Sequence, residues 1–284
     1  SADDLAGVDV MLFDIQDVGT RFYTYISSMQ EYLESAIENH RPLIILDRPN
    51  PNGSYVDGPV LDKKFKSFVG MQPIPTVYGM TIGEYAKMLI GEHWLDSAAT
   101  AASSGDFKLT IIPCKNYTHH SKYTLPVKPS PNLPNMQAIY LYPSLCLFEG
   151  TSISLGRGTD KPFQLFGSPS FPRDLFQFTP TSMPGAKNPP LLNQTCYGFD
   201  LSQIDVAKTT HNRVSLQWII QAYKLFPDKE HFFLKGNFFS KLAGTDVLQQ
   251  QIKDGLTEEQ IRKSWQPALD HFKTIRKKYL LYAE

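Results

Sequence analysis

Short apolar runs alternate with amphipathic segments along the first half of the chain. Val8–Ile15 and Leu43–Leu46 are apolar runs of strand length, which are typical of strands buried on both faces of a sheet. Residues 107–112 alternate between apolar and polar side chains and then become apolar. This pattern predicts a third strand.

Two segments between these runs have the spacing of helices. From Phe22 to about Asn39, apolar residues recur on one face of a helix. Thr81–Glu84 has the form of a capping box, which predicts a helix from there to about His93. Strands and helices that alternate at this spacing predict an α/β domain with a mainly parallel sheet and helices on both of its faces.

A proline-rich stretch separates this part from the rest. Leu125–Pro134 contains four prolines and is typical of an extended linker, so we place a domain boundary just beyond it. This boundary divides the chain into a first domain, residues 1–136, and a second, smaller α+β domain, residues 137–284.

The second half mixes both kinds of element. Thr151–Leu155 and Cys196–Leu201 have the pattern of strands, and Val214–Phe226 that of a helix. Another capping box, Thr257–Gln260, precedes an amphipathic segment that predicts a long terminal helix.

Composition and charge narrow the classes of partner. The chain has 284 residues, with 28 Lys and Arg against 28 Asp and Glu, so no sequence-wide basic surface is expected and no nucleic-acid partner either. No apolar run approaches the ~20 residues of a membrane-spanning helix. The three cysteines and seven histidines show no metal-binding spacing, so we expect neither a catalytic metal nor a cofactor.

The beginning of the sequence is unusual for a domain. It starts Ser-Ala-Asp-Asp, without an initiator Met or a signal peptide, and reaches the first predicted strand within a few residues. Because a central strand is a poor place for a domain to begin, we expect an earlier segment to precede these residues.

Polar side chains cluster where the first two predicted strands end. Ligands of open parallel sheets bind beyond these ends, and mixed carboxylate, guanidinium and amide groups suit a polyhydroxy ligand such as a sugar. The alternative is that Asp17–Arg21 and Asp47–Arg48 are ordinary ion pairs of loops. Tyr23 follows the first cluster and offers a ring face for a sugar. The two clusters consist of Asp14, Gln16, Asp17 and Arg21, and of Asp47, Arg48, Asn50 and Asn52.

Three further candidates lie beyond the first domain. Glu149 ends an apolar segment without a capping role, so it is a candidate general acid, or else a residue bonded to the Gly156–Thr159 loop. Arg157 stands between two glycines of that loop, as an anion clamp or as part of a turn. Asn132 lies in a rigid polar tip of the linker, which either faces an interdomain cleft or is a plain loop.

Several longer motifs follow one another along the chain, namely Phe13–Tyr25, Leu46–Gly53, Tyr78–Glu84, Pro129–Asn132, Leu147–Thr151, Gly156–Thr159, Pro162–Phe163 and Trp265–Tyr282. Together they resemble the motifs of the NamZ family of exo-β-N-acetylmuramidases. The resemblance spans essentially the whole chain and implies a Rossmann-like domain, a smaller C-terminal domain and a site in the cleft between them. The family's Pro-Glu-His-Gly motif, whose Glu is its favoured catalytic residue, does not occur in this sequence.

The resemblance also implies an activity. Members of this family are glycosidases of cell-wall recycling that release N-acetylmuramic acid from non-reducing ends of peptidoglycan fragments, which places them in the periplasm or outside the cell. Glycosidases generally use two carboxylates. One would come from the preceding segment and the other from Asp17, Asp47 or Glu149.

Selectivity for a muramic residue requires a cation for its lactyl carboxylate, and Arg48 and Arg157 are the candidates. A protein that binds cell-wall sugars without cleaving them is the alternative function. An amidase or esterase is disfavoured because no matching nucleophile motif is present. The remaining substrate-binding candidates are Asp14, Gln16, Arg21, Tyr23, Asn50, Asn132 and Thr159.

Overall fold

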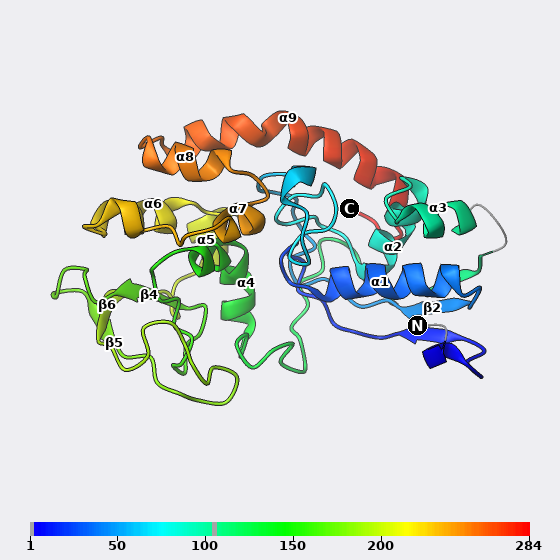
Figure 1. Cartoon of the computed structure of the whole chain (residues 1–284), viewed down its shortest axis with the longest axis horizontal. Coiled ribbons are helices and arrows are strands. Elements are labelled where there is room, and N and C mark those ends of the chain that lie inside the picture. Colours follow the sequence, from blue (N-terminus) through cyan, green and yellow to red (C-terminus); the bar gives the residue numbers. More distant parts are fainter. Residues whose placement is uncertain (1–2, 104–106) are drawn as a thin grey trace.

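The computed structural model describes residues 3–103 and 107–284. Figure 1 shows two lobes joined by a long helix along one side. The first lobe contains a parallel sheet in the order β1-β2-β3, in which Met11 aligns with Leu43 and Leu43 with Leu109. Its elements are β1 (Met11–Phe13), α1 (Tyr25–Glu38), β2 (Leu43–Leu46), α2 (Ile82–Gly91), α3 (Ser97–Ser103) and β3 (Leu109–Ile112).

The parallel α/β organisation predicted for this lobe is confirmed, but full burial of its sheet is not. One face, with Met11 and Leu43, packs in a common core with α1 and α2. On the other face Leu12 is 51% exposed and Ile112 is 49% exposed. The expectation of strands buried on both faces was therefore wrong, since an apolar run alone does not show which of its faces is covered.

The second lobe combines a small antiparallel sheet with helices. The sheet order is β4-β6-β5, and both pairings of β6 are antiparallel. The elements are α4 (Met136–Leu145), a 3-10 helix (Cys146–Gly150), β4 (Leu165–Ser168), β5 (Phe176–Phe178), β6 (Cys196–Asp200), α5 (Val206–Thr210), α6 (Gln217–Leu225), α7 (Phe238–Ala243), α8 (Val247–Lys253) and α9 (Glu258–Arg276).

Most local predictions for this lobe are confirmed. The strand at Cys196, the helix within Val214–Phe226 and the capping box at Thr257 are all present. Thr151–Leu155 is not a strand, because Thr151 bridges to Phe233 and Ser154 bridges to Gly167. The segment passes from one partner to another, so no ladder forms.

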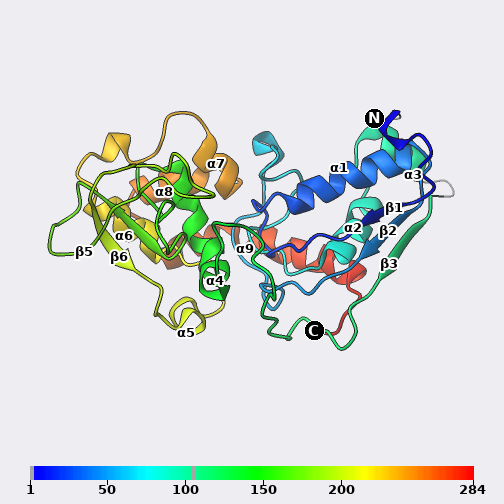
Figure 2. The ribbon, with the colours of Figure 1, turned by 90° about the horizontal axis from the view of Figure 1, so that it is seen from below.

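Helix α9 connects the two lobes. Trp265 and Leu269 belong to the core of the second lobe, whereas Phe272 belongs to the core of the first. The view from below shows α9 passing behind the junction (Figure 2). The chain thus leaves the first domain near α4 and returns to it at the end of α9. Within residues 3–103 and 107–284, none of the helices combines the length and apolar character needed to cross a bilayer.

A buried ion pair stabilises the junction. The Arg262 guanidinium on α9 donates to Asp57 Oδ1 at 2.7 Å and to the Val214 carbonyl at 3.0 Å. Asp57 Oδ2 accepts from the Val214 main-chain N–H at 2.7 Å. Because each partner satisfies the other's charge, the pair fixes the first domain against α9 and the loop before α6.

Candidate active site

The polar loops that follow β1 and β2 contact each other, as their positions predicted. The Arg48 guanidinium binds Asp14 Oδ1 at 2.6 Å, and the Gln16 amide donates to the Pro49 carbonyl at 2.9 Å. The Asp14–Arg48 pair is partly exposed. Among the described residues, the alternative pairs Asp17–Arg21 and Asp47–Arg48 do not form.

Asp47 lies inside a hydrogen-bond network instead of facing an open site. The hydroxyls of Thr81 and Tyr282 both donate to its Oδ2 at 2.6 Å, and the Gly83 N–H donates to Oδ1 at 2.9 Å. Burial raises the pKa of Asp47. The carboxylate therefore ties the end of β2 to the start of α2 and to the C-terminal segment.

Asp17 is also buried, close to the start of α1. Its Oδ2 accepts a short hydrogen bond from the Tyr78 hydroxyl and a bond of 2.6 Å from the Gly19 N–H. Burial raises its pKa to about 6. Within the described part of the chain, Oδ1 has no partner. Gly19 has φ +79°, and a Cβ there would lie 2.1 Å from Asn50 Oδ1, so only glycine fits between these loops.

Arg21 binds other parts of the protein, although it was predicted to lie open to a ligand. Its side chain is 0% exposed, and its guanidinium donates to the carbonyls of Pro59, Ile74 and Leu242. Burial lowers its pKa to about 9. Since Leu242 belongs to α7 of the second domain, Arg21 joins the two domains, and its side chain has no exposed surface for a ligand.

The remaining candidates of the first domain contact the protein itself. Tyr23 donates from its hydroxyl to the Pro129 carbonyl at 2.8 Å, and the Asn50 side-chain amide donates to the Met80 carbonyl at 2.8 Å. Asn132, at the tip of the linker, donates to the Gly185 carbonyl at 3.0 Å. The linker tip therefore contacts a loop of the second domain, which agrees with its predicted position near the boundary between the domains.

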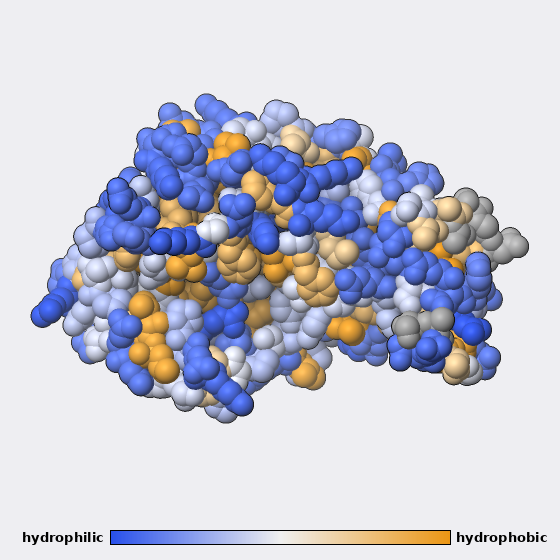
Figure 3. Space-filling view, viewed as in Figure 1, coloured by the Kyte–Doolittle hydropathy of each residue, from blue (hydrophilic) through white to orange (hydrophobic). Residues whose placement is uncertain are grey.

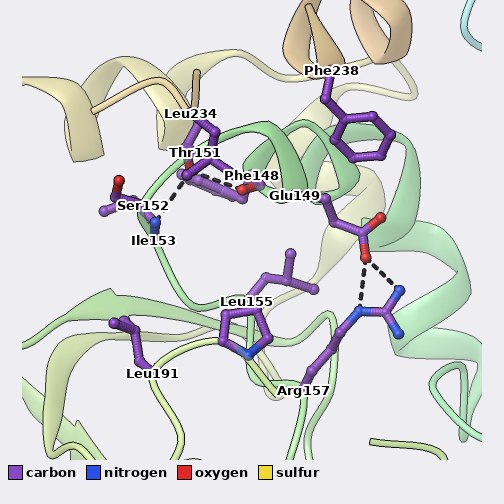
Figure 4. A pocket seen from close by; sticks show the side chains of 11 residues that line it. Phe148, Glu149, Thr151, Ser152, Ile153, Leu155, Arg157, Leu191, Leu234 and Phe238 are labelled. Carbon is purple, nitrogen blue, oxygen red and sulfur yellow. Dashed lines mark hydrogen bonds and ion pairs between the residues drawn. The ribbon is translucent and has the colours of Figure 1, made fainter. Parts of the chain in front are cut away.

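A hollow of about 530 Å³ lies in the second domain. Its charged part is formed by Glu149 and Arg157, and most of its wall is apolar (Figure 4). In the space-filling view, apolar side chains are exposed near the centre, where Figure 1 has α4, α5 and α7 (Figure 3). The lining residues are Phe148, Glu149, Thr151, Ser152, Ile153, Leu155, Arg157, Pro190, Leu191, Leu234 and Phe238.

Glu149 and Arg157 form an ion pair at one side of this hollow. Arg157 Nε donates to Glu149 Oε1 at 2.7 Å, and Nη2 makes a short contact with the same oxygen. The side chains are 21% and 29% exposed for Glu149 and Arg157. Glu149 therefore has features of both predicted roles, because it binds the Gly156–Thr159 loop and also borders a cavity.

Local sequence explains how the pair is presented. Gly156 and Gly158 both have φ +80°, so the chain turns sharply on either side of Arg157. Thr159 stabilises this turn, since its hydroxyl donates to the Gly156 carbonyl at 2.7 Å. Next to Glu149, a Cβ on Gly150 would lie 2.6 Å from Phe239 Cα, so this glycine permits the close approach of α7.

The pair leaves one edge of the guanidinium available. Nε and Nη2 bind Glu149, and among the described residues Nη1 has no acceptor. Arg157 Cζ lies 4.9 Å from the centre of the Phe163 ring, which covers a face of the guanidinium and not its edges. A carboxylate can therefore bind the Nη1–Nη2 edge, in the bidentate geometry that guanidinium groups favour.

The predicted site residues consequently fall into separate groups. Glu149 and Arg157 share the main hollow, and Thr159 lines a separate hollow of about 420 Å³ with Phe176 and Phe178. A small hollow of about 90 Å³ lies between the domains. Within the residues that the structure describes, no group of side chains could hold a metal ion.

The apolar side of the hollow was not predicted from the sequence. Leu234 and Phe238 are exposed large hydrophobic residues, and both line it. They lie more than 80 positions after Glu149, so only the fold brings them together. Phe163 was noticed as part of a motif, but its contact with Arg157 has no sequence signal.

Comparison with known proteins agrees with this architecture. The chain is 38% identical over 294 aligned residues to the peptidoglycan β-N-acetylmuramidase NamZ of Bacillus subtilis (strain 168), covering 98% of this chain and 68% of that protein. Two crystal structures of DUF1343 family proteins from Bacteroides fragilis NCTC 9343 are also similar. One has a TM-score of 0.94 and 49% identity, and covers 100% of this chain and 78% of the other. The second has a TM-score of 0.82 and 26% identity, with 99% and 77% covered.

Family models match both halves of the chain. The N-terminal domain of exo-β-N-acetylmuramidase NamZ matches residues 1–137, and the C-terminal domain matches residues 140–282. The two matches follow each other in the order in which the structure presents its two domains. The chain therefore belongs to the NamZ family of exo-β-N-acetylmuramidases.

Proposed function

We propose that this chain is a peptidoglycan-processing glycosidase that releases N-acetylmuramic acid from the non-reducing ends of cell-wall fragments. Membership of the NamZ family supports the glycosidase activity. The relative from Bacillus subtilis is named for β-N-acetylmuramidase activity on peptidoglycan. The same membership disfavours a binding protein without activity. Because peptidoglycan lies outside the cytoplasmic membrane, we expect the protein to act in the periplasm or outside the cell.

The Glu149–Arg157 pair beside the hollow is the observation that carries this proposal. We assign Glu149 the role of general acid for the leaving sugar, because it is a carboxylate bordering a cavity with apolar walls. Asp17 and Asp47 were the other predicted carboxylates. Their hydrogen bonds from Tyr78 and from Thr81 favour roles in holding the loops.

Arg157 is the residue that we assign to the lactyl carboxylate of the muramic residue. Its Nη1–Nη2 edge suits a carboxylate, while its other edge keeps Glu149 in place. N-acetylglucosamine lacks the lactyl group, so the same hollow would bind it without this ion pair. Arg48 was the other predicted cation, but its guanidinium binds Asp14.

Hydrolysis of two chromogenic substrates tests the proposal. We expect the protein to cleave p-nitrophenyl β-N-acetylmuraminide in preference to the matching β-N-acetylglucosaminide. Arg157→Ala should raise KM for the muraminide and reduce the preference by 10- to 100-fold, as expected for a charged hydrogen bond of about 1.5–3 kcal/mol. Arg213→Ala is the matched control, because Arg213 forms an exposed ion pair with Glu259.

Two results would contradict the proposal. Cleavage of neither substrate by folded protein would favour the binding-protein alternative. Equal cleavage of both substrates would keep the glycosidase activity but remove the role of Arg157 in recognising the lactyl group.

A further inference from the structure

Two bulky apolar residues have an unusual backbone beside the hollow. Eight described non-glycine residues have positive φ, and six of them are His or Asn. Asn in particular tolerates this left-handed conformation, whereas for large apolar side chains it is strained. The other two are Phe163, with φ +56°, and Leu191, with φ +60°. Leu191 lines the hollow, and Phe163 contacts Arg157.

Phe163 is held in this conformation from several sides. It is 1% exposed, and its main-chain N–H donates to the Leu155 carbonyl at 2.8 Å. The centre of its ring lies 4.9 Å from Arg157 Cζ and 4.8 Å from the centre of the Tyr142 ring, which it meets at 74°. Strained residues that persist because their surroundings fix them are concentrated at functional sites.

The contacts of Tyr142 extend this packing to the first domain. Its ring lies 5.2 Å from that of Phe22 and 6.0 Å from that of Tyr23, edge to face in both cases. The rings of Phe163, Tyr142 and Phe22 therefore form a continuous support from beneath Arg157 to the start of α1. This packing explains how Arg157, in a short loop between two glycines, keeps a single orientation.

We propose that Phe163 is a positioning residue that holds the Arg157 guanidinium in the orientation that recognises the muramic carboxylate. The proposal rests on the function proposed above. An aromatic ring attracts a guanidinium through its face, so it fixes the plane of the cation and leaves its N–H edges for Glu149 and for substrate. The left-handed backbone directs the ring to this position.

A thermodynamic cycle with Arg157 tests the proposal. Phe163→Leu removes the ring but keeps apolar volume, and we expect it to lower kcat/KM for the muraminide by about 30-fold. In the background of Arg157→Met, which retains Glu149, we expect Phe163→Leu to cause little further loss. A purely structural role would give the same loss in both backgrounds.

A second variant and a control complete the experiment. Phe163→Met keeps more of the buried volume while it removes the ring face, and it should reproduce the loss even if Phe163→Leu folds poorly. Phe171→Leu is the control, because Phe171 is buried in the same core but does not line the hollow. We expect it to have equal effects in both backgrounds.

The outcomes separate this proposal from the proposed function. Folded Phe163→Leu or Phe163→Met protein with wild-type kcat/KM would overturn the positioning role, and so would equal losses with and without Arg157. Failure of the unmodified protein to cleave the muraminide would instead overturn the function, before any variant is compared.

Discussion

Replacement of Glu149 by Gln separates its role as an acid from its role in packing. Glu149→Gln keeps the shape of the side chain and one oxygen that can accept from Arg157 Nε, but it cannot donate a proton to a leaving sugar. General acid catalysis contributes about 10²–10⁴-fold, so we expect a loss in this range on a disaccharide of N-acetylmuramic acid and N-acetylglucosamine.

The structure limits the effect of this change on stability. The bonds to Arg157 lose their second charge, which costs about 1 kcal/mol after allowance for partial exposure of both side chains. We therefore expect Glu149→Gln protein to remain folded. Glu259→Gln is the control, since it neutralises a carboxylate of an exposed ion pair.

Substrates with different leaving groups show whether Glu149 acts as a general acid. A p-nitrophenolate departs without protonation, so Glu149→Gln should retain much more activity on the p-nitrophenyl muraminide than on the disaccharide. Release of N-acetylmuramic acid and of p-nitrophenolate measures the two rates. Full activity on the disaccharide would show that Glu149 is not the general acid, and equal large losses on both substrates would indicate a nucleophile instead of an acid.

Three further changes test how the site is supported. Asp57→Ala removes the acceptor at 2.7 Å from Arg262 and leaves Glu258, at 4.0 Å, as its only carboxylate partner among the described residues. Urea unfolding should show a loss of about 2 kcal/mol, and a loss below about 0.5 kcal/mol would show that the junction does not depend on this pair. Gly150→Ala places a Cβ 2.6 Å from Phe239 Cα, so its melting temperature and its activity should both fall, whereas wild-type values would contradict the close approach. Burial raises the pKa of Asp17 from 3.8 to about 6, so the protonated carboxyl is favoured in the folded protein. The free energy of unfolding should therefore fall by about 2 kcal/mol between pH 4 and pH 7. Asp17→Asn should remove this part of the pH dependence, and an unchanged profile would refute it.

Patterns within one segment predicted the elements of the fold well. Capping boxes at Thr81 and Thr257 locate the starts of α2 and α9, since all four residues of each motif are adjacent in sequence. The exposure of Leu12 could not be predicted, because it depends on which distant elements cover the sheet. The failure at Thr151–Leu155 has the same origin, since strand pairing requires a partner that the segment itself does not specify.

The candidate site was predictable only in part. Glu149 was identified as a carboxylate in an apolar segment without a capping role, and the flanking glycines identified Arg157. Arg21 and Asp47 were predicted as site residues because they lie in polar clusters. In the structure, however, Arg21 binds carbonyl oxygens from distant parts of the chain, and Asp47 accepts hydrogen bonds from distant hydroxyls. Sequence shows which groups are present, whereas only the fold shows which of them already have partners.

A crystal structure of the protein with N-acetylmuramic acid would show directly whether the hollow beside Glu149 binds the substrate. We expect the sugar in this hollow, with its lactyl carboxylate at about 2.7–2.9 Å from the Nη atoms of Arg157. N-acetylglucosamine should bind more weakly in the same place. A lactyl carboxylate bound to Arg48, or a sugar bound away from this hollow, would contradict the account.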